Sequence, residues 1–168
     1  YDHGHHGNAI LSRFPILHAH NQDVTHLQFE KRGLLHCRVA LPTGPAAHCV
    51  CVHLSLFGYS RRKQLAALAD YLNKTAEPDA PLIIAGDFND WSNRAGHLLA
   101  QSLGMTEVFS DHGGPPVRSF PAAMPMFRLD RIYVRGFTVK RTEVHFGQPW
   151  SKISDHAALS AHLTRHGN

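Results

Sequence analysis

The sequence predicts an α+β fold in which two β-sheets pack face to face with helices outside. Many short apolar segments alternate with turn-forming residues, whereas only two segments are predicted to be helices. The chain has 168 residues, a length that suits one domain of roughly 100–200 residues. We therefore predict a single domain over residues 1–168.

Composition excludes several classes of protein. Hydrophobic residues make up 43% and charged residues 18% of the chain, as in globular proteins and unlike disordered or collagen-like ones. No apolar run approaches the roughly 20 residues that span a bilayer, and the polar start, Tyr1–His6, is not a signal peptide. The formal net charge of +4 mildly favours anionic partners.

The cysteines predict a reducing environment. There are three of them, an odd number without the spacing of a disulfide framework, so we expect a cytoplasmic protein. Alternation along a strand would place Cys49 and Cys51 on one face. We interpret them as small buried hydrophobic residues, with a metal or redox pair as the alternative.

The first half of the chain predicts four strands. They are expected at Asn8–Ser12, Val24–Glu30, Leu34–Leu41 and His48–Leu54. The turn-forming run Pro42–Pro45 separates the last two strands, which indicates an antiparallel hairpin.

Two helices enclose a buried strand in the middle of the chain. Ser60 is the expected cap of a helix that runs to about Lys74, with one apolar stripe along it. Arg61 lies in the first turn of this helix, and Arg61-Arg62-Lys63 predicts a solvated basic face, with a phosphate-facing patch as the alternative. The continuous apolar run Pro81–Gly86 predicts a strand covered on both faces. A second helix is expected from Ser92 to Leu103, with Gly104 as its C-cap.

The last third of the chain predicts three more strands. These are Arg128–Val134, Thr138–Phe146 and Ala157–Leu163. The Gly- and Pro-rich stretch Ser110–Pro125 is interpreted as a long surface loop.

The run Gly86-Asp87-Phe88-Asn89 carries the first candidate site. It follows a buried strand, and alternation would point Asp87 and Asn89 the same way with Phe88 in the core. A carboxylate beside a neutral amide suits phosphate-ester chemistry, because the acid can hold a metal or activate water and the amide can donate to a phosphoryl oxygen. An Asx-rich turn at a strand end is the alternative.

Further candidates lie at strand ends or within strands. Asp130 stands in the middle of a predicted strand, where a buried carboxylate needs a partner. Arg128 and Arg131 are the structural candidates, and a histidine across the sheet is the functional one. His53 ends its strand, and the pair Asp155-His156 precedes the last strand, where a rigid scaffold holds loop residues in place.

The order of these segments resembles the endonuclease/exonuclease/phosphatase superfamily, which has the DNase I-like fold. The resemblance rests on Gly7–Arg13, His53, Gly86–Asn89, Asp130 and Ser154–His156, and it covers nearly all of the chain. The superfamily includes apurinic endonucleases, neutral sphingomyelinases and inositol-polyphosphate 5-phosphatases. It implies a four-layer sandwich of two mixed β-sheets with flanking helices and a site at one end of the sheets. It also implies phosphoester hydrolysis by in-line attack of water.

The resemblance assigns a role to each motif residue around the attacking water. Asp87 would activate or orient the water, and Asn89 would hold a phosphoryl oxygen. His53 would support the leaving group or the transition state. Asn8 would lie near the site on the substrate side, without a definite role.

The same resemblance assigns the last two motifs. His156 would contact the scissile phosphate as a catalytic and substrate-binding residue, and Asp130 would orient its ring. Asp155 would bind the divalent cation, Mg²⁺ or Mn²⁺, directly or through water.

One departure from the family pattern concerns the start of the chain. Family members place an Asn and a metal-binding Glu on strands upstream of the segment that resembles Gly7–Arg13, whereas Asp2 is the one carboxylate before Asn8. We therefore expect the chain to be the C-terminal two-thirds of such an enzyme. Its metal site would be incomplete and its own activity weak, and its free sheet edges would allow self-association.

The substrate is left open between nucleic acid, a lipid headgroup and a small phosphoester. A non-catalytic relative that acts as a binding domain is the first alternative function. A histidine-rich metal-binding protein is the second, because His3, His5 and His6 are imidazole ligands that select Zn, Cu or Ni.

Overall fold

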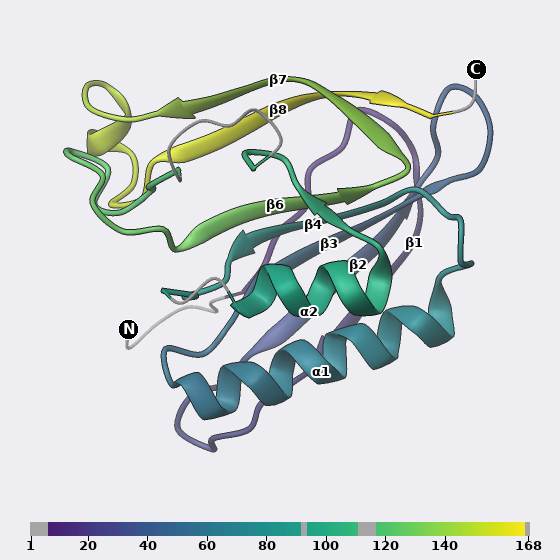
Figure 1. The fold of residues 1–168 in the computed structure, drawn as a ribbon, viewed down its shortest axis with the longest axis horizontal. Coiled ribbons are helices and arrows are strands. Elements are labelled where there is room, and N and C mark those ends of the chain that lie inside the picture. The colour runs from purple at the N-terminus through teal and green to yellow at the C-terminus, as the bar shows by residue number, and fades with distance from the viewer. Residues whose placement is uncertain (1–6, 92–93, 111–116, 167–168) are drawn as a thin grey trace.

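A computed structural model describes residues 7–91, 94–110 and 117–166 of the protein. Within these ranges a six-stranded mixed sheet lies at the centre, a pair of helices covers one face, and a two-stranded sheet lies on the other (Figure 1). The predicted α+β class, with two sheets packed face to face and helices outside, is confirmed.

The central sheet positions most of the candidate residues. Its strands, in spatial order, are β1 (Ile16–Asp23), β2 (Gly33–Val39), β3 (Ala47–His53), β4 (Leu82–Asp87), β6 (Asp130–Arg135) and β5 (Thr106–Glu107). β2 and β3 form the predicted antiparallel hairpin, and β3 runs parallel to β4. β6 is antiparallel to β4, so the end of β4 meets the start of β6.

Helices α1 (Gly58–Thr75) and α2 (Arg94–Leu103) bury their apolar stripes against one face of this sheet. The predicted stripe of α1 is buried throughout, at Leu65, Leu68, Ala69 and Leu72. α1 is also the crossover that parallel strands such as β3 and β4 require. Gly104 ends α2 in the left-handed region, at φ +62°, as predicted for a C-cap. The expected start at Ser92 lies outside the described residues.

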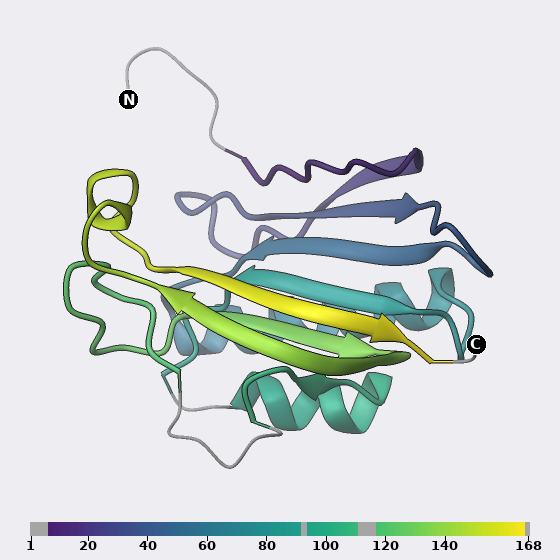
Figure 2. The same cartoon turned by 90° about the horizontal axis from the view of Figure 1, so that it is seen from above.

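The second sheet consists, in the described residues, of β7 (Phe137–His145) and β8 (Ala158–Arg165). The connection between these two strands includes the short 3₁₀ helix Trp150–Lys152. Figure 2 shows this ribbon lying over the β4 and β6 side of the large sheet. A second apolar core fills the space between the two sheets, and Val134, Val139 and Leu159 belong to it.

Two predicted strands in the first third are wrong. Asn8–Ser12 has no strand conformation, because the Asn8 side chain bonds to main-chain carbonyls and no described strand pairs with the segment. Val24–Glu30 is a turn closed by a single bridge between Leu27 and Glu30. The strand that pairs with β2 is instead β1, which is exposed along almost its whole length.

The start of α1 also differs from the prediction. The helix begins at Gly58 with Phe57 as N-cap, and Ser60 is buried inside the first turn. Arg61 is buried as well and donates to the carbonyls of Ser55 and Leu56, at 2.9 and 3.1 Å. The solvated-face interpretation is therefore wrong for this arginine, which holds the β3–α1 connection in place.

The cysteines follow the structural interpretation. Cys37 is buried, Cys49 and Cys51 are half-buried, and all three are free thiols. Burial raises the pKa of Cys49 to about 11, which keeps the thiol protonated and unreactive at neutral pH. Of the helices in the described ranges, none is long and apolar enough to cross a membrane.

Candidate active site

Three candidate side chains form one row across the central sheet. β3 and β4 pair His53 with Asp87, and β4 and β6 pair Asp87 with Asp130. Residues that are paired in register point to the same face of a sheet. In β4 this is also the face of Ile83, which packs in the core between the two sheets. The row therefore lies at the strand ends on the side of the second sheet, opposite the helices.

Gly86 allows Asp87 to reach this row. Its φ is +139°, and a Cβ at this position would lie 2.0 Å from the carbonyl oxygen of Val52 on β3. Only glycine fits so close an approach of two backbones. Beyond it, the Leu54 N–H donates to the Asp87 carbonyl at 2.8 Å and the Phe88 N–H donates to Leu129 at 2.9 Å. The end of β4 is thus fixed from both sides.

Asn89 holds the carboxylate of Asp87. It adopts a left-handed φ of +48°, and its N–H donates to Asp87 Oδ1 at 2.8 Å. Its side-chain amide donates to the Leu54 carbonyl at 2.9 Å and to Asp87 Oδ2 at 3.3 Å. Phe88 between them is fully buried, as predicted from the alternation. Asn89 is only 2% exposed, so the role of phosphoryl ligand stays a prediction.

Asp130 and His156 form the second half of the site. Asp130 Oδ2 accepts a hydrogen bond from His156 Nδ1 at 2.7 Å, which leaves Nε2 as the atom that can contact a ligand. This bond is the main reason that the pKa of His156 is raised. Arg128 and Arg131 bind Glu107 instead. The functional interpretation of Asp130, a histidine partner across the sheet, is therefore the one that the structure supports.

Burial sets the protonation of the other pair. His53 Nε2 lies 3.4 Å from Asp87 Oδ2, and their side chains are 49% and 16% exposed. Desolvation raises the pKa of Asp87, and the nearby carboxylate of Asp130 adds to the effect. Desolvation lowers the pKa of His53, and the charge of Arg32 lowers it further. At neutral pH, His53 is thus a neutral imidazole, whereas His156 holds its proton to higher pH.

The predicted metal ligand stands apart from these contacts. Asp155 is exposed, and its carbonyl accepts from the Ala122 N–H at 2.6 Å. Within the described ranges, no group of three or more His, Cys, Asp or Glu side chains could hold a metal ion. Asp87 and Asp130 are instead engaged by their protein partners. The described residues therefore do not make a complete cation site, and His3, His5 and His6 lie outside them.

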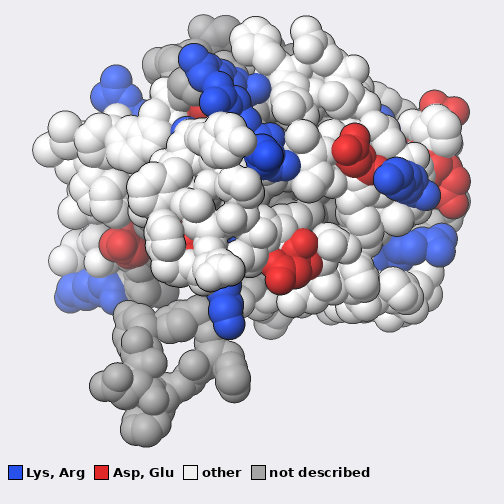
Figure 3. Space-filling model, turned by 90° about the horizontal axis from the view of Figure 1, so that it is seen from below, with Lys and Arg blue, Asp and Glu red and all other residues white. Residues whose placement is uncertain are grey.

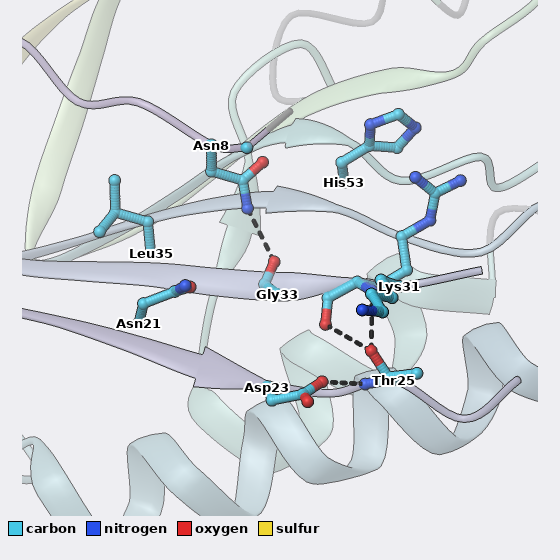
Figure 4. Close-up of a pocket in the computed structure, with 10 residues that line it drawn as sticks. Asn8, Asn21, Asp23, Thr25, Lys31, Gly33, Leu35 and His53 are labelled. Carbon is cyan, nitrogen blue, oxygen red and sulfur yellow. Dashed lines mark hydrogen bonds between the residues drawn. The ribbon is translucent and has the colours of Figure 1, made fainter. Parts of the chain in front are cut away.

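Asn8 is connected to the site by a cavity of about 650 Å³, because Asn8 and His53 both line it. Figure 4 shows the Asn8 amide turned toward the Gly33 carbonyl, to which it donates at 2.7 Å. The cavity extends from His53 across β2 and β1, on the same face of the sheet as the row. Lys31 and Arg32 line it as well, and the sequence analysis missed them. The one feature of the sequence that could have indicated these two residues is that they form a basic pair in a polar turn.

The chain belongs to the Endonuclease/Exonuclease/phosphatase family, whose model matches residues 1–156. Among curated proteins it is similar to the uncharacterized protein YbhP of Escherichia coli, with 46% identity over 164 residues. That match covers 97% of this chain and 64% of YbhP, so the chain spans less than two thirds of that relative's length. A UPF0294 protein of Vibrio cholerae is 28% identical over 129 residues, which are 76% of this chain and 43% of the relative.

Solved structures share the fold. An endonuclease/exonuclease/phosphatase from Bacteroides vulgatus superposes with a TM-score of 0.76 at 17% identity, over 91% of this chain and 67% of that one. A mannosyl-6-phosphatase from Bacteroides thetaiotaomicron gives 0.73 at 16% identity, over 90% and 67%. TDP2 of D. rerio, complexed with a single-strand DNA product, gives 0.73 at 21% identity, over 90% and 69%. The DNase I-like fold implied by the sequence motifs is therefore confirmed.

Proposed function

We propose that the protein hydrolyses a phosphodiester or phosphomonoester by in-line attack of water. One observation carries the proposal: four segments far apart in the chain bring His53, Asp87, Asp130 and His156 to one end of the sheets. The pKa values of Asp87 and His156 are raised, whereas the pKa of His53 is lowered. Such groups are typical of sites that move protons.

Each side chain has a role in this proposal. Asp87, whose raised pKa makes it a better base, accepts the proton of the attacking water. His156, held by Asp130, donates from Nε2 to a phosphoryl oxygen as charge develops there. His53, across the row from Asp130, supports the leaving group. Asn89 fixes the orientation of the Asp87 carboxylate, because it donates a hydrogen bond to each of the two carboxylate oxygens.

A divalent cation, Mg²⁺ or Mn²⁺, belongs to the proposal as a requirement of the family, whose enzymes generally use divalent metals. Asp155 is the carboxylate that we propose for it. A hard cation of this kind takes several oxygen ligands, and the described residues do not supply them together.

We propose a phosphoester as the substrate and leave open which class of phosphoester it is. The mannosyl-6-phosphatase and the TDP2 complex with DNA show that neighbours of this fold act on or bind different molecules. Figure 3 shows Lys and Arg dispersed among uncharged and acidic residues on the helix side of the molecule. The residues that the structure describes therefore form no continuous basic stripe on that face, of the kind that would favour a nucleic acid.

Hydrolysis of bis-p-nitrophenyl phosphate with Mg²⁺ or Mn²⁺ tests the proposal. We expect metal-dependent turnover by the chain, or by a longer form of the protein that carries it. Asp87→Ala should lower it by at least about 10²-fold. Asp70→Ala is a matched control, because Asp70 is an exposed carboxylate on α1, on the other face of the sheet. Equal rates for the protein and its Asp87→Ala variant would refute the mechanism.

The incomplete cation site favours a second candidate function, a domain that binds phosphoesters without hydrolysing them. Binding of a substrate analogue with no turnover at any metal concentration would support it.

We also propose self-association through strand edges, because β1 is an exposed edge strand and β8 has no partner beyond β7 among the described strands. Sedimentation at rising protein concentration tests this second proposal.

A further inference from the structure

A buried arginine lies directly beneath the row of candidate side chains. Arg131 follows Asp130 on β6, so its side chain points to the opposite face of the sheet. This is the face of Tyr133, which packs in the core under the helices. Arg131 is paired in register with Gly86, just as Asp130 is paired with Asp87, and it is only 1% exposed. The guanidinium therefore lies under the strands and does not contact a ligand bound at the row.

Two hydrogen bonds connect this guanidinium to different parts of the molecule. The Arg131 Nη2 donates to the main-chain carbonyl of Asp90 at 3.0 Å, and Nη1 donates to Glu107 Oε1 on β5 at 3.1 Å. The Asp90 side chain in turn accepts from the Ala95 N–H in the first turn of α2, at 2.8 Å. Arg131 thus ties β6 to the connection between β4 and α2.

The guanidinium holds the segment that carries Asn89. Asn89 is followed directly by Asp90, whose carbonyl the guanidinium binds. It is preceded by Phe88, whose ring lies 5.1 Å from that of Tyr133 on β6, centroid to centroid. The left-handed φ of Asn89 is uncommon for a residue other than glycine. Contacts on both sides therefore keep Asn89 where its N–H groups reach the Asp87 carboxylate.

Stability alone gives little reason for this arginine. Burial removes the guanidinium and its carboxylate partner from water, and such a pair is often no more stabilising than apolar side chains of the same size. Among the described residues, Arg131 Nε is also buried without a hydrogen-bond partner, as is the hydroxyl of Tyr133 on the same face of β6. An unpaired buried donor costs free energy. The contribution specific to the arginine is its bond to the Asp90 carbonyl.

We propose that Arg131 is a positioning residue for the reaction, because its bond to the Asp90 carbonyl holds Asn89 against the carboxylate of the proposed base. The inference rests on the proposed function, in which Asp87 is that base. Asp130 stands beside Arg131 in the same strand and carries the other half of the site. One side chain therefore joins the two halves and fixes how they lie relative to each other.

Arg131→Lys removes the bond to the carbonyl and keeps the positive charge. The compact ammonium group of lysine does not span the two acceptors that the forked guanidinium binds, so it pairs with Glu107. Arg128→Lys is the matched control. Arg128 donates to the same Glu107 oxygen at 3.4 Å, and its other bond is to the Val117 carbonyl, outside this segment. Glu107→Gln is a second control, because it removes the ion pair and keeps an acceptor for both arginines.

Amide hydrogen exchange of the chain measures the effect without turnover. The quantity compared is the exchange rate of the Asn89 N–H divided by that of Val50 and Ile84, two buried strand residues that report global unfolding. In Arg131→Lys this ratio should rise at least about tenfold, as the loss of one bond to a charged group allows. Both controls should leave the ratio unchanged. A general loss of stability would change all three rates together and leave the ratio as it is.

Turnover of bis-p-nitrophenyl phosphate then shows whether the position of Asn89 matters to the reaction. Arg131→Lys should lower kcat about tenfold and leave KM unchanged, because the guanidinium orders the reacting groups and touches no substrate. Arg128→Lys should keep both parameters. The assay uses the chain or the longer form of the protein, whichever is active.

The outcomes separate this inference from the proposed function. An unchanged exchange ratio in Arg131→Lys would overturn the inference and leave the proposed function standing. An equal effect of Arg128→Lys would do the same, because it would assign the loosening to the ion pair. A raised ratio with an unchanged kcat would also overturn it, since Asn89 would then position no reacting group. A protein that loosens as expected but hydrolyses no phosphoester would overturn the proposed function, and with it the role of Arg131 in the reaction.

Discussion

Acid should destabilise the protein through a buried histidine on the helix side of the sheet. His36 of β2 is 4% exposed. Its Nε2 lies 2.9 Å from His48 Nδ1, and its Nδ1 lies 2.9 Å from the Tyr71 hydroxyl. His48 in turn contacts Glu77 at 3.3 Å. Both ring nitrogens of His36 thus have a polar partner, but none of the atoms that they contact carries a negative charge.

Desolvation is the main reason that the pKa of His36 is lowered from 6.5 to about 4. Between these two values the unfolded chain binds the proton and the folded chain does not. Stability is therefore complete above pH 6.5 and falls as the pH falls toward 4. At pH 4 the loss from this one group is about 3 kcal/mol. That is a large part of the roughly 5–15 kcal/mol that stabilise a typical domain.

Urea unfolding at pH 7.5, 6, 5 and 4 measures the loss, and His36→Leu isolates it. The variant lacks the titrating group, so its free energy of unfolding should fall by about 3 kcal/mol less than that of the parent between pH 7.5 and 4. His97→Leu, which removes an exposed histidine of α2, should follow the parent. Parallel curves for the parent and His36→Leu would refute the reasoning.

Three further results are expected. Gly86→Ala should cost at least about 3 kcal/mol of stability in urea unfolding, because its Cβ meets the β3 backbone, whereas Gly7→Ala, with open space around it, should cost little; equal costs would contradict the close-approach argument. Asp130→Asn should lower the pKa of His156, measured by NMR titration of its ring, since the bond to Asp130 raises it; an unchanged value would assign the shift to other charges. The thiols should resist Ellman's reagent in the native state and react in denaturant, because burial raises the pKa of Cys49 to about 11; fast native labelling would contradict that burial.

The strands whose sequences carry an apolar pattern were predictable, including the largely exposed β7 and β8, whereas the edge strand β1 was not. β2, β3 and β4 carry apolar runs because they lie in the middle of the sheet, and each was placed within a few residues. β1 pairs at the edge, where both faces are exposed, so its sequence shows no apolar alternation. Asn8–Ser12 shows the opposite case, since an apolar run forms no strand without a partner.

Only those residues of the candidate site that belong to sequence motifs could be predicted. The order of the motifs predicted Asp87, Asp130 and His156 as site residues. The register of β4 and β6 places Asp87 beside Asp130, and a hydrogen bond brings His156 to Asp130. The roles of neighbours such as Arg32 depend on turns whose shape no local pattern specifies. The same holds for the contact between the rings of Trp91 and Phe127, 5.0 Å apart, since these residues meet only after the strands have been assembled.

The row of side chains across β3, β4 and β6 carries the proposed reactive groups, whereas segments outside the sheet would select the molecule that binds. Main-chain hydrogen bonds between the strands fix the spacing of these side chains. A change of register by one residue would move every side chain of a strand to the other face of the sheet, so the row cannot shift by small steps. Residues 119–127 fold back on themselves through a hydrogen bond from the Ser119 N–H to the Phe127 carbonyl, and they contact Trp91 outside this row. Exchanging such segments between relatives should therefore change the molecules that the proposed site binds, while His53, Asp87 and Asp130 stay where the sheet holds them.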